Sequence, residues 1–77
     1  MKERLLYLKK EITRYKDMYE FLPISYKEKL EDYKQEYNEI ILHLSESELR
    51  WVDDQFGLWY EKYTMQETYT TMRLPEG

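Results

Sequence analysis

The chain has 77 residues and a formal net charge of −4, with no cysteine, two glycines and two prolines. This length allows one domain with a small core, and the lack of cysteine excludes disulfide bonds and cysteine-based metal sites. The scarcity of glycine and proline disfavours an all-β fold. No apolar run reaches the roughly 18 residues of a membrane span, and the charged N-terminus does not have the pattern of a signal peptide. We therefore expect an all-α, cytoplasmic protein with no membrane partner.

A recurrent capping pattern divides the chain into predicted helices. A serine or threonine followed by glutamate at the third position is typical of a helix N-terminus, because each side chain bonds the other's backbone amide. The pattern occurs at Ser25 with Glu28, Ser45 with Glu48, and Thr64 with Glu67. Pro23 ends the first helix, because proline disfavours helix at the preceding residue. The predicted helices are 2–21, 26–43, 46–63 and a short fourth at 65–72, in a single domain of residues 1–73 with a flexible tail at 74–77.

The first two predicted helices each carry a seam of apolar residues spaced alternately by three and four. The seams run through Leu5, Leu8, Ile12, Tyr15, Tyr19 and Leu22, and through Tyr26, Leu30, Tyr33, Tyr37, Ile40 and Leu44. A short connection makes neighbouring helices antiparallel, so the seams meet layer by layer, with Tyr15 opposite Tyr33. This predicts an antiparallel helical hairpin. We expect the helix at 46–63 to cover its tyrosine-rich seam; the alternative is that the seam is a docking groove for a partner.

The predicted helix at 46–63 has an apolar surface about twice as wide as packing on one hairpin requires. One broad arc holds Leu49, Val52, Phe56, Trp59, Tyr60 and Tyr63. Trp51 and Leu58 fall nearly opposite its centre, so they are either exposed or covered by another element. An exposed tryptophan beside a leucine is typical of a binding hot spot. The candidate partner-binding residues are Trp51, Leu58 and Trp59, with Asp53, Asp54 and Glu61 steering a basic partner surface.

No residue pattern in the chain indicates catalysis or a cofactor. His43 is the one histidine, and the nearby Glu39 and Glu46 lack the spacing of a metal motif. Asp53 and Asp54 are adjacent, so on a helix they point about 100° apart and do not form a shared acid–base site. The serines belong to caps or lie beside one, and a glycine-rich phosphate loop is absent from the sequence. We therefore expect that the protein is not an enzyme and uses no metal or cofactor.

Charge is distributed unevenly along the chain. Residues 1–16 carry a net charge of +4 and residues 36–61 a net charge of −6. Such asymmetry bears on the choice of partner. The favoured hypothesis is a small regulatory or inhibitory protein, of phage or mobile-element type, that binds another protein. The alternatives are an acidic nucleic-acid mimic that blocks a DNA- or RNA-binding enzyme, and a structural or oligomerisation module that forms a homodimer. Direct binding of nucleic acid through the basic residues is disfavoured, because they are spread around their helix.

Three short blocks of residues stand in order in the second half of the chain. They are Leu44-Ser45 with Glu48 and Val52, then Leu58-Trp59-Tyr60, then Thr64-Met65-Gln66-Glu67. This run, from residue 44 to residue 72, resembles the front half of a sigma-factor region-4-type helix-turn-helix, as found in phage late-transcription regulators of Gram-positive bacteria. The resemblance implies a further alternative, a degenerate helix-turn-helix-like transcription regulator that keeps the protein-contacting part. Tyr69 stands where that family has a small residue, and no segment of the chain matches the recognition helix.

Overall fold

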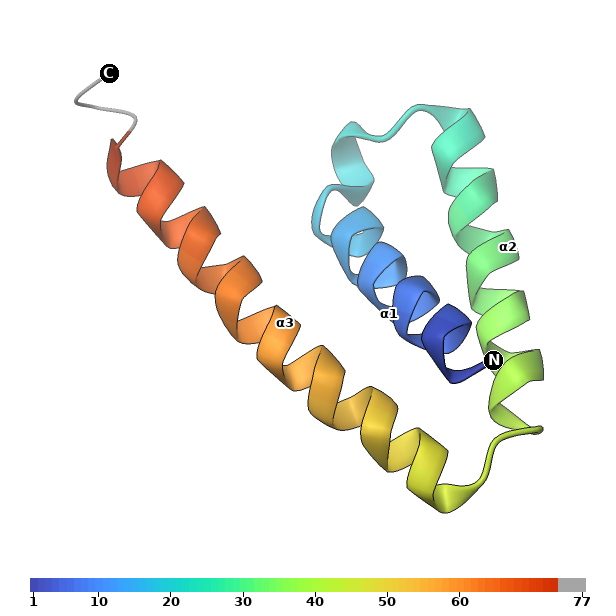
Figure 1. The fold of residues 1–77 in the computed structure, drawn as a ribbon. Coiled ribbons are helices and arrows are strands. Elements are labelled where there is room, and N and C mark those ends of the chain that lie inside the picture. Colours follow the sequence, from blue (N-terminus) through green and yellow to red (C-terminus); the bar gives the residue numbers. More distant parts are fainter. Residues whose placement is uncertain (74–77) are drawn as a thin grey trace.

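The structure is a computed structural model that describes the backbone of residues 1–73 and the side chains of residues 1–65. Its elements are α1 (Lys2–Asp17), a 3₁₀ turn η1 (Tyr19–Phe21), α2 (Ile24–Ile41) and α3 (Glu46–Arg73), as Figure 1 shows. The described backbone contains no strand, which confirms the all-α prediction. None of its helices combines the length and the apolar character needed to cross a membrane. The predicted tail at 74–77 lies outside the described residues.

The connection between the first two helices differs from the prediction at both ends. The α-helix ends at Asp17 rather than at residue 21, and the chain tightens into η1. Leu22 is extended, with φ −77° and ψ 137°, because the residue before a proline is disfavoured in the helical region. The predicted cap at Ser25 is wrong: Pro23 is the N-cap of α2, and its carbonyl accepts hydrogen bonds from the backbone N–H groups of Tyr26 and Lys27.

The start of α3 confirms the capping prediction at Ser45. The backbone N–H of Glu48 donates to the Ser45 hydroxyl oxygen at 3.3 Å, and the backbone N–H of Ser45 donates to the Glu48 carboxylate at 3.1 Å. The predicted separate fourth helix at 65–72 is wrong, because α3 continues without a break to Arg73. The hydroxyl of Thr64 donates to the carbonyl of Tyr60 within the helix, which is a bond that lets threonine continue a helix rather than start one.

The central element of the fold is α1, which contacts α2 on one side and α3 on the other. Contacts between α1 and α2 run in opposite chain directions, since Arg4 pairs with Glu36 whereas Tyr15 meets Tyr26. The predicted layer partner of Tyr15, Tyr33, stacks on it with ring centroids 5.9 Å apart. Figure 1 shows α2 and α3 diverging from their connecting turn, with α1 between them.

Because α2 and α3 diverge, α3 does not cover the whole tyrosine-rich seam. Contacts between α1 and α3 run in the same chain direction, from Lys2 over the Trp51 ring to Asp17, which accepts a hydrogen bond from Tyr63. At the other end of α2, Tyr26 remains 46% exposed. The prediction that the third helix covers the seam is therefore wrong at that end, where the two outer helices are furthest apart.

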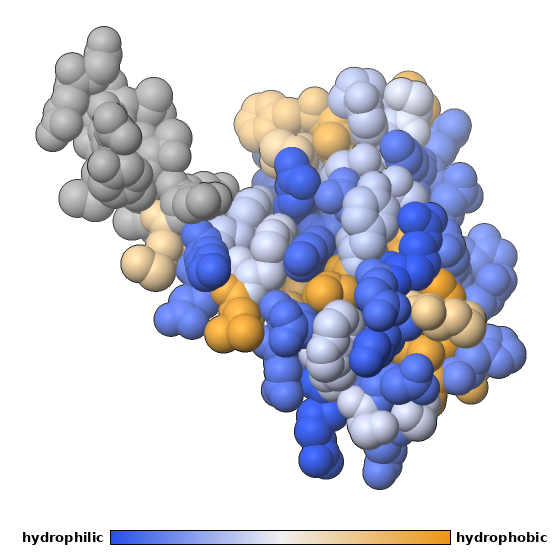
Figure 2. Space-filling view, in the orientation of Figure 1, coloured by the Kyte–Doolittle hydropathy of each residue, from blue (hydrophilic) through white to orange (hydrophobic). Residues whose placement is uncertain are grey.

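The hydrophobic core is small and lies near the turn between α2 and α3. Among the described side chains the buried residues are Leu5, Leu8, Leu30, Tyr33, Ile40 and Val52. All but Leu30 form one cluster, to which α3 contributes Val52. The molecule is flat and elongated, with principal extents of 47 × 30 × 13 Å. So small a core leaves several large apolar side chains at the surface, and Figure 2 shows hydrophobic patches there.

Candidate functional site

The two sides of α3 have different surroundings. The inner side faces α1, where Val52 is 1% exposed and belongs to the core cluster. Further along this side, the rings of Trp59 and Tyr63 stack with centroids 4.8 Å apart and planes 11° from parallel. The amine of Lys10 lies 5.8 Å from the centre of the Trp59 ring, which is a distance that allows cation–π attraction. The inner side is therefore occupied by contacts with α1.

The outer side carries a stripe of residues spaced alternately by three and four, which we call the outer stripe. It consists of Trp51, Asp54, Leu58, Glu61 and Met65. Leu58 is 58% exposed and Met65 is 65% exposed. Residues with this spacing lie above one another on one face of a helix. The outer stripe is therefore a continuous surface on which apolar and acidic side chains alternate.

The structure brings together four of the six predicted site residues and separates two. Trp51, Asp54, Leu58 and Glu61 share the outer stripe. Trp59 lies on the inner side, against Tyr63. Asp53 forms an ion pair with Lys9 at 2.8 Å, so its carboxylate is engaged within the chain. The residue that sequence reasoning missed is Met65. Its seven-residue spacing from Leu58 was a usable signal, but the predicted helix break at Thr64 hid it.

Trp51 is half-buried at the start of the outer stripe. One part of its side chain packs against the core cluster, and the Lys2 amine lies 4.6 Å from the centre of its ring. The indole is therefore held in place by the rest of the fold. A side chain that is already ordered loses less conformational entropy when a partner binds. Trp51 therefore contributes to the packing of the fold, and the part of its side chain that stays exposed belongs to the outer stripe.

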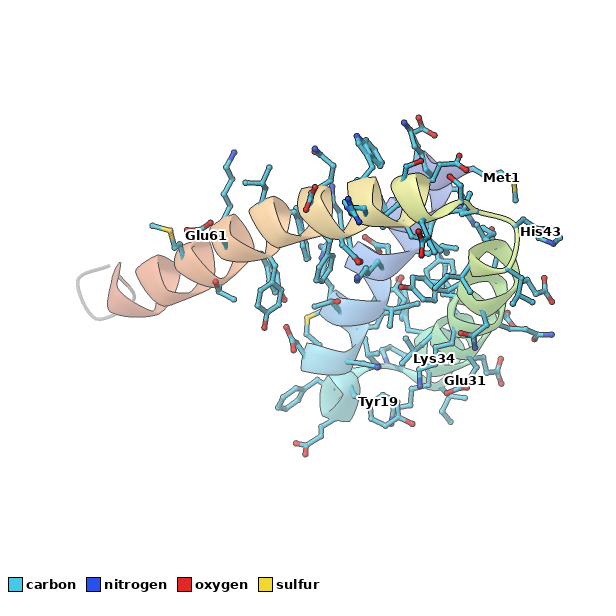
Figure 3. The ribbon with its side chains drawn as sticks, turned by 90° about the horizontal axis from the view of Figure 1, so that it is seen from below. Met1, Tyr19, Glu31, Lys34, His43 and Glu61 are labelled. Carbon is cyan, nitrogen blue, oxygen red and sulfur yellow. The ribbon has the colours of Figure 1, made fainter. Side chains whose placement is uncertain are left out.

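The acidic residues of the outer stripe are free of ion pairs. Asp54 and Glu61 are exposed and pair with no cation among the described side chains. In Figure 3, Glu61 lies toward the C-terminal end of α3, at the opposite end of the helix from His43. Near this point the Tyr63 hydroxyl of α3 donates a hydrogen bond to Asp17, the C-terminal residue of α1. The outer stripe is therefore exposed from Asp54 to Met65, whereas its first member, Trp51, is half-buried.

The capping interaction at Ser45 fixes where α3 begins. Its hydrogen bonds also affect a titratable group. The backbone N–H of Ser45, and secondarily its hydroxyl, hold the pKa of Glu48 below the ordinary carboxyl value. A carboxylate near a helix N-terminus also interacts favourably with the helix dipole. The ionised form of Glu48 is thus the form that stabilises the start of α3.

A second exposed apolar surface lies at η1 and the turn into α2. Phe21 is 86% exposed and Ile24 is 75% exposed, and Figure 2 shows a hydrophobic patch over this end of the molecule. Glu20 and Pro23 interrupt it, and its residues do not share one face of a regular element. This surface is therefore not equivalent to the outer stripe, and it serves as the control surface in the binding experiment.

The remaining sequence hypotheses concern metals, DNA and relatives. Within the described residues, no three potential metal ligands lie together. The two helices and turn implied by the helix-turn-helix resemblance do not occur in residues 46–73, which form one continuous helix. Comparisons of the chain with protein-family models, with curated proteins and with solved structures gave no match.

Proposed function

We propose that the protein is a small, non-enzymatic regulatory protein that acts by binding another protein through the outer stripe of α3. The observation that carries the proposal is the exposure of Leu58 and Met65 seven residues apart on the side of α3 opposite Val52, with the half-buried Trp51 seven residues before Leu58. An unpartnered apolar row along a helix is the feature by which a helix is recognised in a groove or by another helix. The opposite side is already used to hold α3 on α1.

The rest of the fold serves in this proposal as a rigid support for α3. We infer that α1 and α2 form an antiparallel hairpin, supported by the ion pair of Arg4 with Glu36 and the contact of Tyr15 with Tyr26. α3 then packs on α1 through Val52. A helix held in this way is ordered before its partner arrives, which reduces the entropic cost of binding.

The partner we infer has an apolar row flanked by lysine or arginine. Asp54 and Glu61 lie between the apolar residues of the outer stripe and pair with no cation among the side chains of residues 1–65. Burying such carboxylates is costly unless the partner supplies cations and hydrogen bonds. The same charges would accelerate association at low ionic strength. Charge complementarity therefore favours a basic, amphipathic surface.

Self-association is the second candidate. It is favoured by the exposure of Leu58 and Met65 on the outer stripe, which a second copy of the chain would cover. However, two outer stripes paired in antiparallel orientation about Leu58 would place Asp54 opposite Glu61. Since like charges repel, we expect light scattering to give the monomer mass of 9.7 kDa in micromolar solution; a stable dimer would favour self-association instead.

The nucleic-acid mimic has less support. A mimic needs unneutralised carboxylates along one surface, but Glu36 is paired with Arg4 and Asp53 with Lys9. Salt distinguishes the two hypotheses, because exposed charge interactions weaken with ionic strength and apolar contacts do not. We expect the partner complex to survive 0.5 M NaCl. Complete dissociation at that salt concentration would support the mimic.

Site-specific photocrosslinking tests the proposal directly. A photoreactive phenylalanine analogue is placed at Leu58, and the purified protein is irradiated in a lysate of the organism that encodes it. The matched control carries the analogue at Leu42, which is 81% exposed in the turn between α2 and α3. We expect one dominant crosslinked protein at position 58 and none of it at position 42.

Competition by unlabelled variants then identifies the surface. The wild-type protein and the variant Phe21→Gln should suppress the crosslink, whereas Leu58→Gln and Met65→Gln should not. Both stripe residues are well exposed, so the substitutions should leave helicity unchanged by circular dichroism. If Leu58→Gln competes as well as the wild type and Phe21→Gln does not, the binding surface is η1 and the proposal for the outer stripe is wrong.

A further inference from the structure

An open cavity of about 510 Å³ is lined by residues 9–16 of α1 and residues 34–38 of α2. Three lysines line it: Lys9 and Lys16 from α1, and Lys34 from α2. Its lining contains no carboxylate. Such a volume is typical of sites for small molecules. The cavity therefore has both the size and the charge of a site for a small anion.

The three amines differ in how far they are already neutralised. Lys9 is paired with Asp53 at 2.8 Å and lies over the Phe56 ring. Lys34 contacts Glu31 at 3.4 Å, in an exposed pair one helical turn apart. Such exposed pairs contribute little stability. Lys16 has no ion-pair partner among residues 1–65. Two of the amines are thus available to an incoming anion at low cost.

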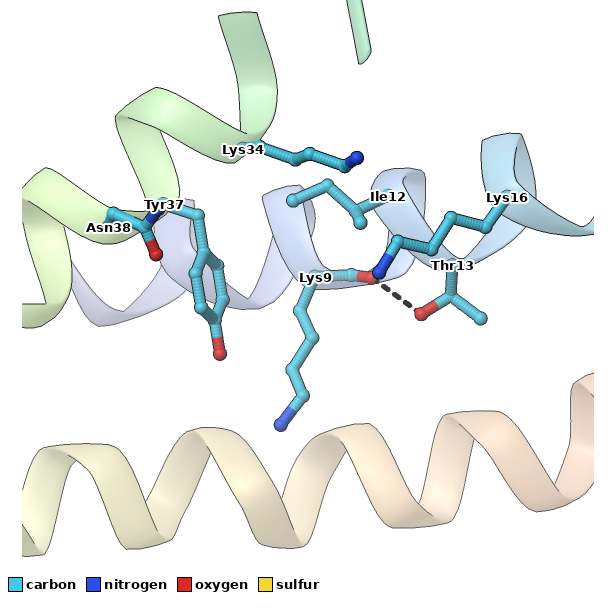
Figure 4. A pocket seen from close by; sticks show the side chains of 7 residues that line it. All are labelled: Lys9, Ile12, Thr13, Lys16, Lys34, Tyr37 and Asn38. Atoms are coloured by element: carbon cyan, nitrogen blue, oxygen red, sulfur yellow. Dashed lines mark hydrogen bonds between the residues drawn. The ribbon is translucent and has the colours of Figure 1, made fainter. Parts of the chain in front are cut away.

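The cavity also offers neutral donors and an apolar wall. Figure 4 shows Lys34 extending from α2 over Ile12, Lys16 running back along α1, and the Tyr37 hydroxyl pointing toward α3. The Tyr37 hydroxyl and the Asn38 amide donate no hydrogen bond to other described residues. The Tyr37 ring and Ile12 are both partly buried. This combination suits a charged group attached to an apolar body.

We propose that this cavity binds a small organic anion, in which a carboxylate or phosphate group meets Lys16 and Lys34 and an apolar body contacts Ile12 and Tyr37. Charge-assisted hydrogen bonds from lysine are the interactions by which proteins commonly hold such groups. Lys9, which lines the cavity, lies over the Phe56 ring of α3. Phe56 precedes Leu58 by two residues, so the two side chains point about 200° apart around the helix. The cavity therefore does not share a surface with the outer stripe, and this proposal is independent of the partner-binding proposal.

NMR titration of ¹⁵N-labelled protein tests the proposal with two defined probes, phenyl phosphate and 1-naphthoate, at low ionic strength. We expect saturable binding of at least one probe, with amide shifts concentrated at residues 9–16 and 34–38. Inorganic phosphate, which lacks the apolar body, should bind more weakly than phenyl phosphate. Absence of saturable binding by both probes would overturn the proposal. Shifts concentrated at η1 or on the outer stripe would overturn it too.

A pair of charge-matched variants distinguishes the cavity from the general charge of the protein. Lys16→Gln/Lys34→Gln removes the two available amines, whereas Arg50→Gln/Lys62→Gln removes two positive charges from exposed positions on α3. The first variant should weaken probe binding by about tenfold or more, and the second should leave it nearly unchanged. Equal weakening by both would mean that only net charge is recognised. If the cavity double variant loses helicity, Lys16→Gln alone replaces it, since Lys16 is exposed.

Discussion

Ser45 shows how one side chain determines the start of a long helix. Its hydroxyl accepts from the Glu48 amide, and the Glu48 carboxylate accepts from the Ser45 amide. We expect Ser45→Ala to lower the free energy of unfolding by about 1 kcal/mol, as measured by urea denaturation. Ser25→Ala is the matched control, because Ser25 lies inside α2 and makes no capping hydrogen bond. An equal loss in both variants would contradict the assignment of the cap.

The ion pair of Arg4 with Glu36 makes stability depend on pH. The hydrogen bond from Arg4 holds the pKa of Glu36 below its ordinary value of 4.5. A carboxyl whose folded pKa is depressed contributes stability above its unfolded pKa and loses it as the pH falls through the folded pKa. We expect the free energy of unfolding to fall below about pH 5, and to fall less steeply in Glu36→Gln. Identical pH profiles for the two proteins would show that this pair contributes nothing.

The capping motif of serine or threonine followed by glutamate predicted a helix start correctly only where no other feature of the chain decided where the helix begins or continues. The Ser45 cap was predictable because it follows a turn with no competing signal. The same motif failed at Ser25, where the fixed backbone of Pro23 already supplies the N-cap. It failed again at Thr64, because the ring contacts of Trp59 with Tyr63 and of Phe56 with Tyr60 continue along the helix. A capping motif inside an apolar periodic run is therefore weak support for a break.

At the scale of the element, α3 combines two surfaces that the sequence pattern could only partly assign. The period of 3.6 residues placed Leu58 away from Val52, and Leu58 is exposed, but Trp51 on the same side is half-buried against the core cluster. It also placed Trp59 in the arc of Val52, and the structure shows that this arc faces α1. The ion pair of Asp53 was not predictable, because it depends on the register of α3 along α1. Periodicity gives angles within a helix, but tertiary contacts decide which angle faces solvent.

Gly57 offers a test of the continuity of α3. It lies in the interior of the helix, and a Cβ atom added there meets nothing within 4 Å apart from its chain neighbours and the nearby backbone of the helix itself. Glycine in a helix interior is less favourable than alanine by about 0.5–1 kcal/mol. We expect Gly57→Ala to raise the free energy of unfolding by this amount in a chemical denaturation experiment. A destabilised variant would indicate that α3 bends or makes a close contact at this residue.

At the scale of the whole molecule, the small core makes stability sensitive to single residues. A domain of this size has a free energy of unfolding of about 4–12 kcal/mol. Leu8 is fully buried, and leucine-to-alanine changes in a core cost about 2–5 kcal/mol. We expect Leu8→Ala to lower the free energy of unfolding by about 2–5 kcal/mol, measured by urea denaturation. Leu42→Ala, at a side chain that is 81% exposed, should change it by less than about 0.5 kcal/mol.

The position of α1 between its two neighbours has a consequence for the order of folding. The contacts that hold α3 on α1 join residues that are 44 and 46 positions apart in the chain. Long separations slow folding, because loop closure must precede the gain from contact. During synthesis α1 emerges first and α3 last, so Leu5 and Leu8 can meet α2 early but must wait for Val52. The interval before Val52 arrives is the period in which the nascent chain presents its apolar residues to chaperones and proteases.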